Sequence, residues 1–591
     1  MEKKKPLSDI HVEDYLEEYA GREKTASDAF FTGGREKESL DGLWHYAADP
    51  YDTCLRQHWF EARGVNAAGF TLPLDFDFEG WPTMTLPCCW NTAAPEFFWY
   101  ESTMVFTRRF RYLPKKAGER VFLRVGAANY ALRVFLNGRY LGSHTGGSTP
   151  AFFELTEALQ TENRILLTAD ASRRPRQVPP ENTDWFNYGG VYRELELFRL
   201  PGTFIREFFV RLKPGSRDRL LVSLRLSDPA AGEAVFSLPE KGVEAALPVS
   251  GGAAEGEIPC PMIKLWTPEE PKLYDVALRF GEDRAEDRVG FREISTEGLQ
   301  ILLNGKPLFL RGVSCHEDTP ERGKALTEED CEQALLEAKA LGCNFMRLAH
   351  YPHTEKMALL ADRLGMLLWE EIPVYWAVRF SDGEVYAEAE NQLSELILRD
   401  RNRASVIFWS VGNENADTDE RFSFMSRLAA AARERDGSRL ITAACMVSAD
   451  NRIADRLAEV LDVIGLNEYF GWYSPDLRQL PELFARSRPE KPVIISEFGA
   501  DALFGHHGTT EDKGTVECQA EVYRRQTEEL SKIPCVRGMT PWILYDFRCP
   551  RRTHPLQGYY NRKGLVDADR RRRKPAWYVL RDFYEKKKAE E

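Results

Sequence analysis

Eight short apolar runs in the second half of the chain limit the fold most strongly. They alternate with helical patterns such as TEEDCEQALLEAKALG, at 327–342. Alternation of this kind predicts βα units and a parallel sheet, and eight units are the number that closes a (β/α)₈ barrel. The predicted strands are 307–313, 343–349, 366–372, 405–411, 439–445, 463–467, 492–498 and 536–544.

The first half of the chain has a different texture. Residues 39–200 carry short alternating apolar runs separated by turn signals such as Asn137-Gly138, which predicts an antiparallel β-sandwich. Residues 201–293 continue in the same style over a length that suits a small immunoglobulin-like β-sandwich. Residues 1–38 are expected to be a polar N-terminal leader, and residues 294–591 to be the barrel domain.

Charge and cysteine content exclude several classes of protein. The net charge of −13 argues against nucleic-acid and membrane-surface binding. One basic run, 570–574, could contact phosphates, although a solvated loop or helix start is the simpler interpretation. The 11 cysteines are scattered and predict no disulfide framework. No apolar leader and no apolar stretch of membrane-spanning length is present, so we expect a soluble, cytoplasmic protein.

Polar and aromatic residues gather where the predicted barrel strands end. Active sites of such barrels lie at this carboxyl-terminal rim, so the accumulation predicts a functional site. The residues are His316, Glu317, Arg347, His350, Trp369, Glu370, Glu371, Asn413, Glu414, the segment 467–473, Glu497 and Trp542.

Two carboxylates of this set are candidates for acid–base chemistry. Glu414 follows the apolar run VIFWSV, and Glu497 ends the run VIIS. A pair of positioned carboxylates is the machinery of glycoside hydrolysis, and burial with mutual repulsion would separate their pKa values. From spacing alone, two ordinary rim glutamates that pair with Arg347 or Arg399 remain the alternative.

The order of several motifs resembles glycoside hydrolase family 2, most of all its bacterial β-glucuronidases. The resemblance covers about residues 40–585, through SVGNEN, ISEFGAD, NTDWFNYGGVYR, LNGKPLFLRGVSCHED, RLAHYPH and LNEYFGWY. It implies a jelly-roll sugar-binding sandwich, an immunoglobulin-like sandwich and a (β/α)₈ TIM barrel, in that order.

The resemblance also implies roles for the candidate residues. Glu414 would be the general acid/base and Glu497 the nucleophile of a retaining exo-β-glycosidase, which requires their carboxyl groups to lie about 5–5.5 Å apart. Asn413 would bond the sugar 2-hydroxyl. The pocket would be shaped by Tyr469 or Tyr473 with Trp472, and the terminal sugar would be held by His316, Arg347, His350 and Trp542.

The sugar is suggested by a second motif. In β-glucuronidases an Asn-x-Lys pair after the eighth strand contacts the uronic-acid carboxylate, and Asn561 and Lys563 match it. Asp184 would bond the 4-hydroxyl. The sequence departs from the family pattern at Gln557, where such enzymes often have arginine; Arg551, Arg552 and Arg562 are nearby substitutes.

We therefore expect hydrolysis of β-D-glucuronides to glucuronic acid and an aglycone. A β-galactosidase or another family 2 β-glycosidase of the same mechanism is the first alternative, and a non-catalytic carbohydrate-binding protein is the second. The relatives suggest a homo-oligomer, either dimer or tetramer.

No metal or required cofactor is expected. His350 and His353 are separated by Pro352, and neither they nor His506-His507 have carboxylate or cysteine partners at ligand spacing. Short bacterial relatives bind flavin mononucleotide (FMN) away from the catalytic centre, but no residue of this sequence argues for that non-catalytic ligand.

Overall fold

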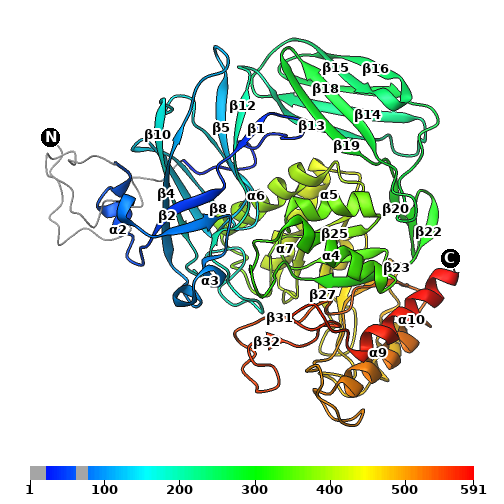
Figure 1. The fold of residues 1–591 in the computed structure, drawn as a ribbon. Coiled ribbons are helices and arrows are strands. Elements are labelled where there is room, and N and C mark those ends of the chain that lie inside the picture. The colour runs from blue at the N-terminus through cyan, green and yellow to red at the C-terminus, as the bar shows by residue number, and fades with distance from the viewer. Residues whose placement is uncertain (1–21, 62–77, 591) are drawn as a thin grey trace. The chain divides into compact units, whose positions relative to one another are not determined.

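The computed structural model describes residues 22–61 and 78–590, and the chain divides into two compact units (Figure 1). The first unit contains residues 1–173, 187–204 and 322–325. The second contains residues 174–186, 205–321 and 326–591. The predicted multidomain β and α/β fold is confirmed.

Eight parallel strands of the second unit close into a barrel, as the sequence predicts. Their apolar composition fits strands whose two faces are both covered. They are β23 (Leu310–Cys315), β24 (Phe345–Leu348), β25 (Leu367–Glu371), β26 (Val406–Asn413), β27 (Leu440–Met446), β28 (Ile464–Asn467), β29 (Val493–Glu497) and β30 (Val536–Met539).

Two predicted strands, the first and the last, differ from the observed strands by more than two residues at one end. The first predicted run, 307–313, overlaps two strands, the short β22 (Lys306–Leu308) and the start of β23. The last run stops at Met539 instead of residue 544, because Pro541 has no N–H to continue the ladder. Trp542 consequently lies beyond β30, on the rim.

Amphipathic helices alternate with the barrel strands. At the start of α4 the side chains of Thr327 and Asp330 form a capping box, which satisfies two N–H groups that would otherwise be unpaired. The helices are α4 (Glu328–Ala340), α5 (Glu355–Leu364), α6 (Gly383–Asp400), α7 (Asp419–Arg435), η7 (Arg456–Glu459), α8 (Gln479–Ser487), α9 (Val516–Leu530) and α10 (Pro575–Glu590).

The amino-terminal end of the barrel is closed by a three-stranded sheet of β20 (Ile294–Glu297), β21 (Gln300–Leu303) and β22. Ile294, Ile301 and Leu303 pack in one apolar cluster with Phe345 and Trp369 of the barrel strands. A packed core at this end leaves the opposite, carboxyl-terminal end for the site.

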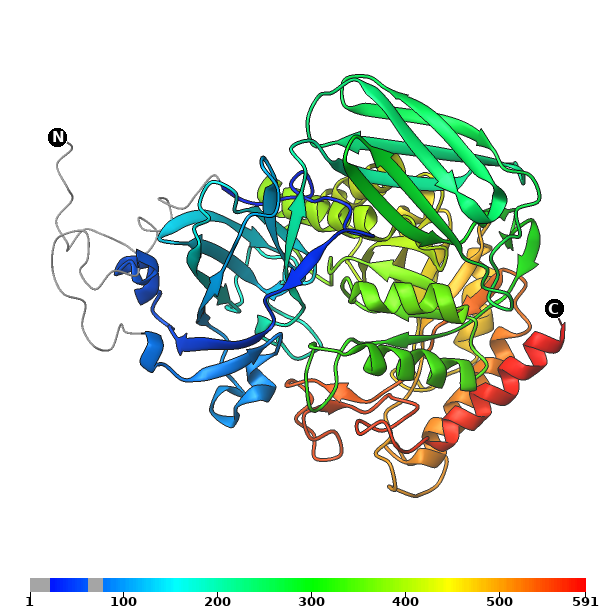
Figure 2. The same cartoon turned by 45° about the horizontal axis from the view of Figure 1, so that its top comes forward.

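Residues 205–289 form two antiparallel sheets of the second unit (Figure 2). One contains β13 (Ile205–Leu212), β14 (Arg219–Leu226) and β17 (Ala253–Pro259). The other contains β16 (Val243–Val249), β15 (Gly232–Leu238), β18 (Tyr274–Phe280) and β19 (Asp283–Val289), with η6 at Pro239–Lys241. This is the predicted immunoglobulin-like sandwich.

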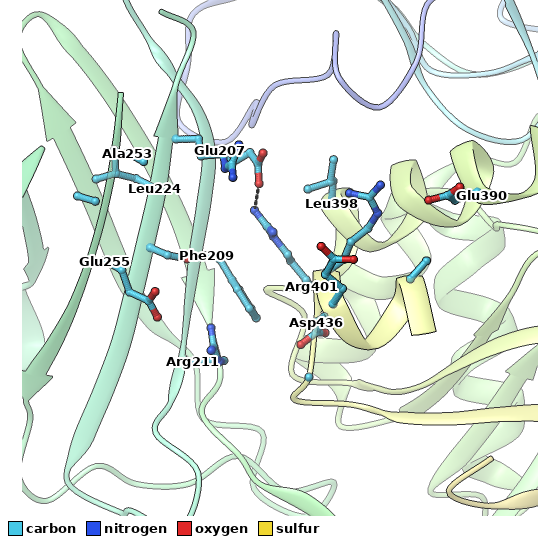
Figure 3. A pocket seen from close by; sticks show the side chains of 17 residues that line it. Glu207, Phe209, Arg211, Leu224, Ala253, Glu255, Glu390, Leu398, Arg401 and Asp436 are labelled. Carbon is cyan, nitrogen blue, oxygen red and sulfur yellow. Dashed lines mark hydrogen bonds and ion pairs between the residues drawn. The ribbon is translucent and has the colours of Figure 1, made fainter. Parts of the chain in front are cut away.

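Buried and partly buried ion pairs join this sandwich to the barrel. Arg401 contacts Glu207 at 2.8 Å and its guanidinium lies 4.9 Å from the ring of Phe209 (Figure 3). Arg403 is paired with Asp287. Beside these contacts is a cavity of 680 Å³ whose lining mixes arginines with glutamates.

The first unit is a two-sheet antiparallel sandwich. Its four-stranded sheet is β1 (Lys37–Ser39), β12 (Leu195–Leu200), β5 (Arg120–Val125) and β9 (Ala151–Glu154). Its six-stranded sheet is β3 (Thr83–Leu86), β2 (Gly42–Ala48), β4 (Thr103–Arg111), β10 (Glu162–Asp170), β7 (Ala131–Leu136) and β8 (Arg139–Thr145). Shorter elements are α2 (Thr53–Arg56), η2 (Trp59–Glu61), η4 (Phe78–Gly80), α3 (Trp90–Ala93), η5 (Pro95–Phe97), β6 (Ala128–Asn129) and β11 (Gly190–Val191).

Part of the segment expected to be a polar leader packs on this sandwich. Phe30 is buried against the rings of Phe122, Phe152 and Phe198. Residues 1–21 of the expected leader lie outside the described residues.

The basic run before α10 is largely used within the chain. Arg572 pairs with Asp567 and Arg573 with Glu337, while Lys574 is buried against Asp546 at 2.7 Å. These pairs favour the interpretation as a loop that leads into a helix. No helix in the part of the chain that the structure describes is both long and apolar enough to cross a membrane.

Candidate active site

Glu497 ends β29 and is almost completely buried at the barrel rim. Its Oε1 accepts a hydrogen bond of 2.8 Å from Arg347, and its Oε2 accepts one of 2.8 Å from the hydroxyl of Tyr469. The two bonds fix both carboxylate oxygens. A carboxylate oriented in this way is preorganised for attack on a carbon above it.

Arg347 connects this carboxylate to the rest of the rim. Its guanidinium contacts Glu371 at 3.1 Å and donates a 2.8 Å bond to Asn413 Oδ1. Burial lowers the pKa of Arg347, but the two carboxylates outweigh burial and raise it. Burial alone would raise the pKa of Glu371, but Arg347 and His350 have the larger effect and lower it to about 2. Arg347 and Glu371 therefore stabilise each other in their charged forms.

Glu414 follows directly after β26 and is half-buried, with a left-handed backbone at φ 52°. Its Oε2 accepts a 2.8 Å bond from the indole N–H of Trp376, and its Oε1 accepts a 3.0 Å bond from Asn467. Burial raises the pKa of Glu414, and the charge of Glu497 raises it further. A raised pKa favours the protonated form of Glu414, which is the form that a general acid requires.

Two asparagines link the carboxylates. Asn467 is the register partner of Glu497 on the neighbouring strand and donates to both Glu414 and Asn413 Oδ1. The same Oδ1 of Asn413 also accepts a hydrogen bond from the guanidinium of Arg347. The Nδ2 of Asn413 is buried and has no hydrogen-bond partner among the described residues. This amide donor is therefore available to a sugar hydroxyl.

Aromatic rings surround the carboxylates. His350 stacks on Trp542 at 4.8 Å between ring centres, and its Nδ1 lies 2.8 Å from Glu371. His316 packs against Trp542 at 5.2 Å and its Nδ1 lies 3.1 Å from the Tyr351 hydroxyl. Flat apolar surfaces next to a few fixed polar groups are typical of sugar-binding sites.

Asn561 is the last residue of β32 (Tyr560–Asn561), and Lys563 lies in the segment directly after this strand. Lys563 is fully buried; its Nζ donates 2.9 Å to the Tyr473 hydroxyl and lies 3.3 Å from Asp501. Burial lowers the pKa of Lys563, but Asp501 and Tyr473 raise it more. Two of its three N–H donors are used in these contacts, which leaves one for an anionic group.

Asp184 is connected to Lys563 through Asn561, whose Oδ1 accepts from the Lys563 backbone N–H. Its carboxylate pairs with Arg552 and accepts 3.3 Å bonds from Asn561 Nδ2 and Cys549 Sγ. Arg552 also interacts with the Tyr473 hydroxyl. Asp184, Asn561, Lys563 and Arg552 thus form one connected polar cluster.

The three arginines considered as substitutes for a residue at 557 point in different directions. Arg552 belongs to the cluster just described, whereas Arg562 is directed to Asp546 at 3.4 Å. Arg551 donates 3.1 Å to Asn182. Gln557 donates 3.2 Å to Asp501, the partner of Lys563. Arg552 is therefore the nearby arginine that could stand in for the missing one.

The three aromatic residues predicted to shape the pocket, Tyr469, Trp472 and Tyr473, do not all contact the same groups. Tyr469 contacts Glu497, whereas Tyr473 contacts Lys563 and is 59% exposed. Trp472 packs in a small cluster with Ala500 and Val522.

Sequence reasoning gave no role to three residues of the site. In the sequence, Glu371 stands out only as a strand end, Trp376 has no local signal, and Trp185 is marked only as the neighbour of Asp184. Trp185 packs 4.9 Å from Tyr375 and 5.6 Å from His350. Adjacency to Asp184 in NTDWFNYGG was the available signal for Trp185. Within 22–61 and 78–590, no group of three or more His, Cys, Asp or Glu is arranged to hold a metal ion.

Family comparisons agree with this architecture. The TIM barrel domain of glycosyl hydrolases family 2 matches residues 294–588, the sugar binding domain of that family matches 37–201, and a third family 2 domain matches 219–292. The protein is a glycoside hydrolase. The chain belongs to glycosyl hydrolases family 2.

Individual relatives are distant but match over nearly their full length. The chain is 28% identical over 584 residues to a beta-glucuronidase of Paenibacillus borealis, covering 91% of this chain and 95% of the relative. It is 28% identical over 614 residues to the beta-glucuronidase of Homo sapiens, covering 93% and 91%.

Solved structures give the same picture. A GH2 beta-galacturonidase from Eisenbergiella tayi, bound to galacturonate, has a TM-score of 0.81 at 25% identity and covers 94% of this chain and 98% of its own. A beta-D-glucuronidase of Dictyoglomus thermophilum has a TM-score of 0.79 at 26% identity, covering 93% and 97%.

Proposed function

We propose that the protein is a retaining exo-β-glucuronidase, which releases glucuronic acid from β-D-glucuronides by double displacement. The observation that carries the choice of sugar is the buried cation Lys563, next to Asn561 and Arg552. The ammonium group of Lys563 has a third N–H beyond those in its contacts with Tyr473 and Asp501. It could donate a charge-assisted hydrogen bond to a carboxylate at C6 of the sugar.

In the first step Glu497 attacks the anomeric carbon and forms a covalent glycosyl ester. Glu414 gives its proton to the departing glycosidic oxygen, so the aglycone leaves as a neutral alcohol or phenol. In the second step Glu414, now ionised, removes a proton from water, which attacks the same carbon and releases Glu497. Two inversions retain the anomeric configuration.

The groups around the two glutamates support these roles. Arg347 and Tyr469 hold Glu497 with both oxygens directed. Burial and the neighbouring charge raise the pKa of Glu414, which favours the protonated form that the first step needs. The buried amide N–H of Asn413 is a donor for the sugar 2-hydroxyl. Hydrogen bonds to this hydroxyl strengthen in the transition state, where positive charge develops on the sugar ring.

Two other sugars are the alternatives. A galactoside lacks the C6 carboxylate, so Lys563 would then face a neutral hydroxyl. A galacturonide has the carboxylate and differs at C4, and the structural relative from Eisenbergiella tayi carries the name of that activity. Glucuronides are favoured because the curated relatives are beta-glucuronidases over nearly their full length.

A panel of 4-nitrophenyl β-D-glucuronide, β-D-galacturonide and β-D-galactoside tests the proposal. We expect the highest kcat/KM with the glucuronide. Lys563→Met should lower kcat/KM on the uronides by about one to two orders of magnitude, as expected for a lost hydrogen bond to a charged group, with little change on the galactoside.

Lys513→Met is the matched control, because Lys513 is a nearby cation that donates to the Trp472 carbonyl. It should leave the ratio between sugars unchanged. Faster turnover of the galactoside by the wild type would overturn the uronide assignment. A galacturonide preferred over the glucuronide would correct the sugar and keep the role of Lys563.

We further propose that the enzyme acts without a cofactor, as a cytoplasmic homo-oligomer. The two-step reaction uses only side chains of the chain and water, and FMN has no part in it. All 11 cysteines are free thiols, which suits a reducing compartment. Light scattering of the purified protein tests the oligomer.

A further inference from the structure

The segment after β25 carries a tryptophan that is fastened to the proposed acid/base. The N–H of Trp376 donates 2.9 Å to the Asn413 carbonyl, and its own carbonyl accepts 2.9 Å from Asn415 Nδ2. The backbone between these bonds is left-handed, at φ 50°. A bulky residue adopts this conformation only where its surroundings enforce it, and such strain gathers at functional sites.

The side chain of Trp376 ends at the catalytic carboxyl. Its indole N–H lies 2.8 Å from Glu414 Oε2. An acid must come within hydrogen-bond distance of the oxygen that it protonates, and this oxygen is the first atom of the leaving group. The aglycone therefore begins beside Trp376, and the half-buried indole is a surface on which it can rest.

An exposed cation lies over the same indole. The guanidinium carbon of Arg551 is 4.8 Å from the Trp376 ring centre, and its NH1 donates 3.1 Å to Asn182. Cation–π contact and the asparagine together hold an otherwise flexible side chain.

Two arginines and one carboxylate meet next to this indole. Asp184 pairs directly with Arg552, while Arg551 Nε stays 3.8 Å from the same carboxylate. Two arginines thus share one carboxylate, and Arg551 is the more exposed of the two, at 44% of its side chain against 24%. Arg551, over the Trp376 ring, is therefore the arginine of this pair that a further anion can approach more easily.

We propose that Trp376 and Arg551 form an acceptor subsite that selects aromatic aglycones bearing an anionic substituent. This inference rests on the proposed glucuronidase activity and adds the substrate class on the leaving-group side. Trp376 stacks on the aglycone ring, and Arg551 attracts a carboxylate on that ring. Trp376 is also a positioning residue, because its N–H orients Glu414.

The experiment compares two glucuronides of nearly equal shape, 4-carboxyphenyl and 4-carbamoylphenyl β-D-glucuronide. We measure kcat/KM for each with wild type, Arg551→Gln and the control Arg571→Gln, which removes another exposed cation. Taking the ratio of anionic to neutral substrate within each variant, and comparing ratios between variants, cancels the difference in leaving-group chemistry.

We expect Arg551→Gln to lower the ratio by about two- to five-fold at low ionic strength, the size of an exposed charge pair, and the effect to fade in 0.5 M salt. Arg571→Gln should leave the ratio unchanged. An unchanged ratio in Arg551→Gln, with normal turnover of the neutral glucuronide, would overturn the acceptor subsite and leave the glucuronidase proposal intact. Failure of the wild type on both substrates would instead refute the glucuronidase.

Trp376→Phe tests the positioning role separately. It keeps a ring for stacking and removes the N–H that stabilises ionised Glu414. The other titratable groups that interact with Glu414 include Glu497, His350, Tyr375 and Tyr469, and Asn467 is a neutral donor. Losing the indole bond raises the pKa of Glu414, so the alkaline limb of kcat/KM should move to higher pH. An unmoved limb would refute the positioning role.

Discussion

Arg347 and Glu497 form an ion pair of 2.8 Å in which the arginine side chain is completely buried. The same guanidinium contacts Glu371 and Asn413. Three partners around one planar cation require its fork of donors, which lysine lacks. The position of the proposed nucleophile therefore depends on this one side chain.

Arg347→Lys should accordingly lower kcat by at least about 100-fold, the order seen when a reacting group is misplaced by about 1 Å. Steady-state kinetics on an aryl glucuronide measures the loss. Arg421→Lys is the control, because Arg421 is equally buried and pairs with Asp455 away from the two glutamates. If Arg421→Lys reduced kcat as much, the loss would reflect general packing damage.

The division of labour between the two glutamates predicts a leaving-group effect. Glu414→Gln removes the acid, so hydrolysis of an alkyl glucuronide should fall by about 10²–10⁴-fold. A 2,4-dinitrophenyl glucuronide needs no protonation, and its first step should survive as a burst. Glu497→Gln should abolish the first step with both substrates, and so the burst with the 2,4-dinitrophenyl glucuronide. An equal loss on both substrates in Glu414→Gln would contradict its role as acid.

Glu468 predicts a pH dependence of stability. Burial raises its pKa from 4.5 to about 8, although Phe470 N–H and Gln526 hydrogen-bond to it. Because the folded pKa is raised above the unfolded value, stability is greatest below about 4.5, falls as pH rises toward about 8, and is then level. Each unit corresponds to about 1.4 kcal/mol, so the fall is a few kcal/mol.

Thermal unfolding of wild type and Glu468→Gln between pH 5 and 9 measures this contribution. The Tm of Glu468→Gln should fall less over that range. Glu482→Gln on the exposed part of α8 is the control and should follow the wild type. Parallel curves for wild type and Glu468→Gln would show that Glu468 is ionised throughout.

Gly564, immediately after Lys563, has no room for a side chain. A Cβ there would lie 2.2 Å from the backbone nitrogen of Asp546. Gly564→Ala should therefore destabilise the protein by about 1–3 kcal/mol and, by moving Lys563, lower kcat/KM on glucuronides. Gly383→Ala, where no atom lies within 4 Å, should do neither. Denaturant unfolding and kcat/KM on an aryl glucuronide, measured for both variants, test this prediction. Equal stability and equal kcat/KM in Gly564→Ala and Gly383→Ala would contradict it.

The barrel could be predicted because each strand reveals itself in a local apolar run. The carboxylates at the ends of β26 and β29 could be found for the same reason. The end of β30 was misplaced because one residue, Pro541, interrupts an apolar run that otherwise continues.

The polar clusters could not be derived in this way, because their contacts join residues far apart in the chain. Lys563 contacts Tyr473 and Asp501, and Arg552 contacts Asp184. No periodic pattern in the sequence indicates that these residues contact each other. Trp376 is held by Asn413 and Asn415 through backbone geometry that no local pattern encodes.

Residues 174–186 lie between strands of the first sandwich in sequence, yet they belong to the compact unit of the barrel. Asp184 and Trp185 of this segment meet Arg552 and His350 there. During synthesis the ribosome makes Asp184 more than 360 residues before Arg552, as the 368-residue separation shows. The sugar site therefore cannot assemble until nearly the whole polypeptide has been made, and a barrel excised as residues 294–588 would lack part of it.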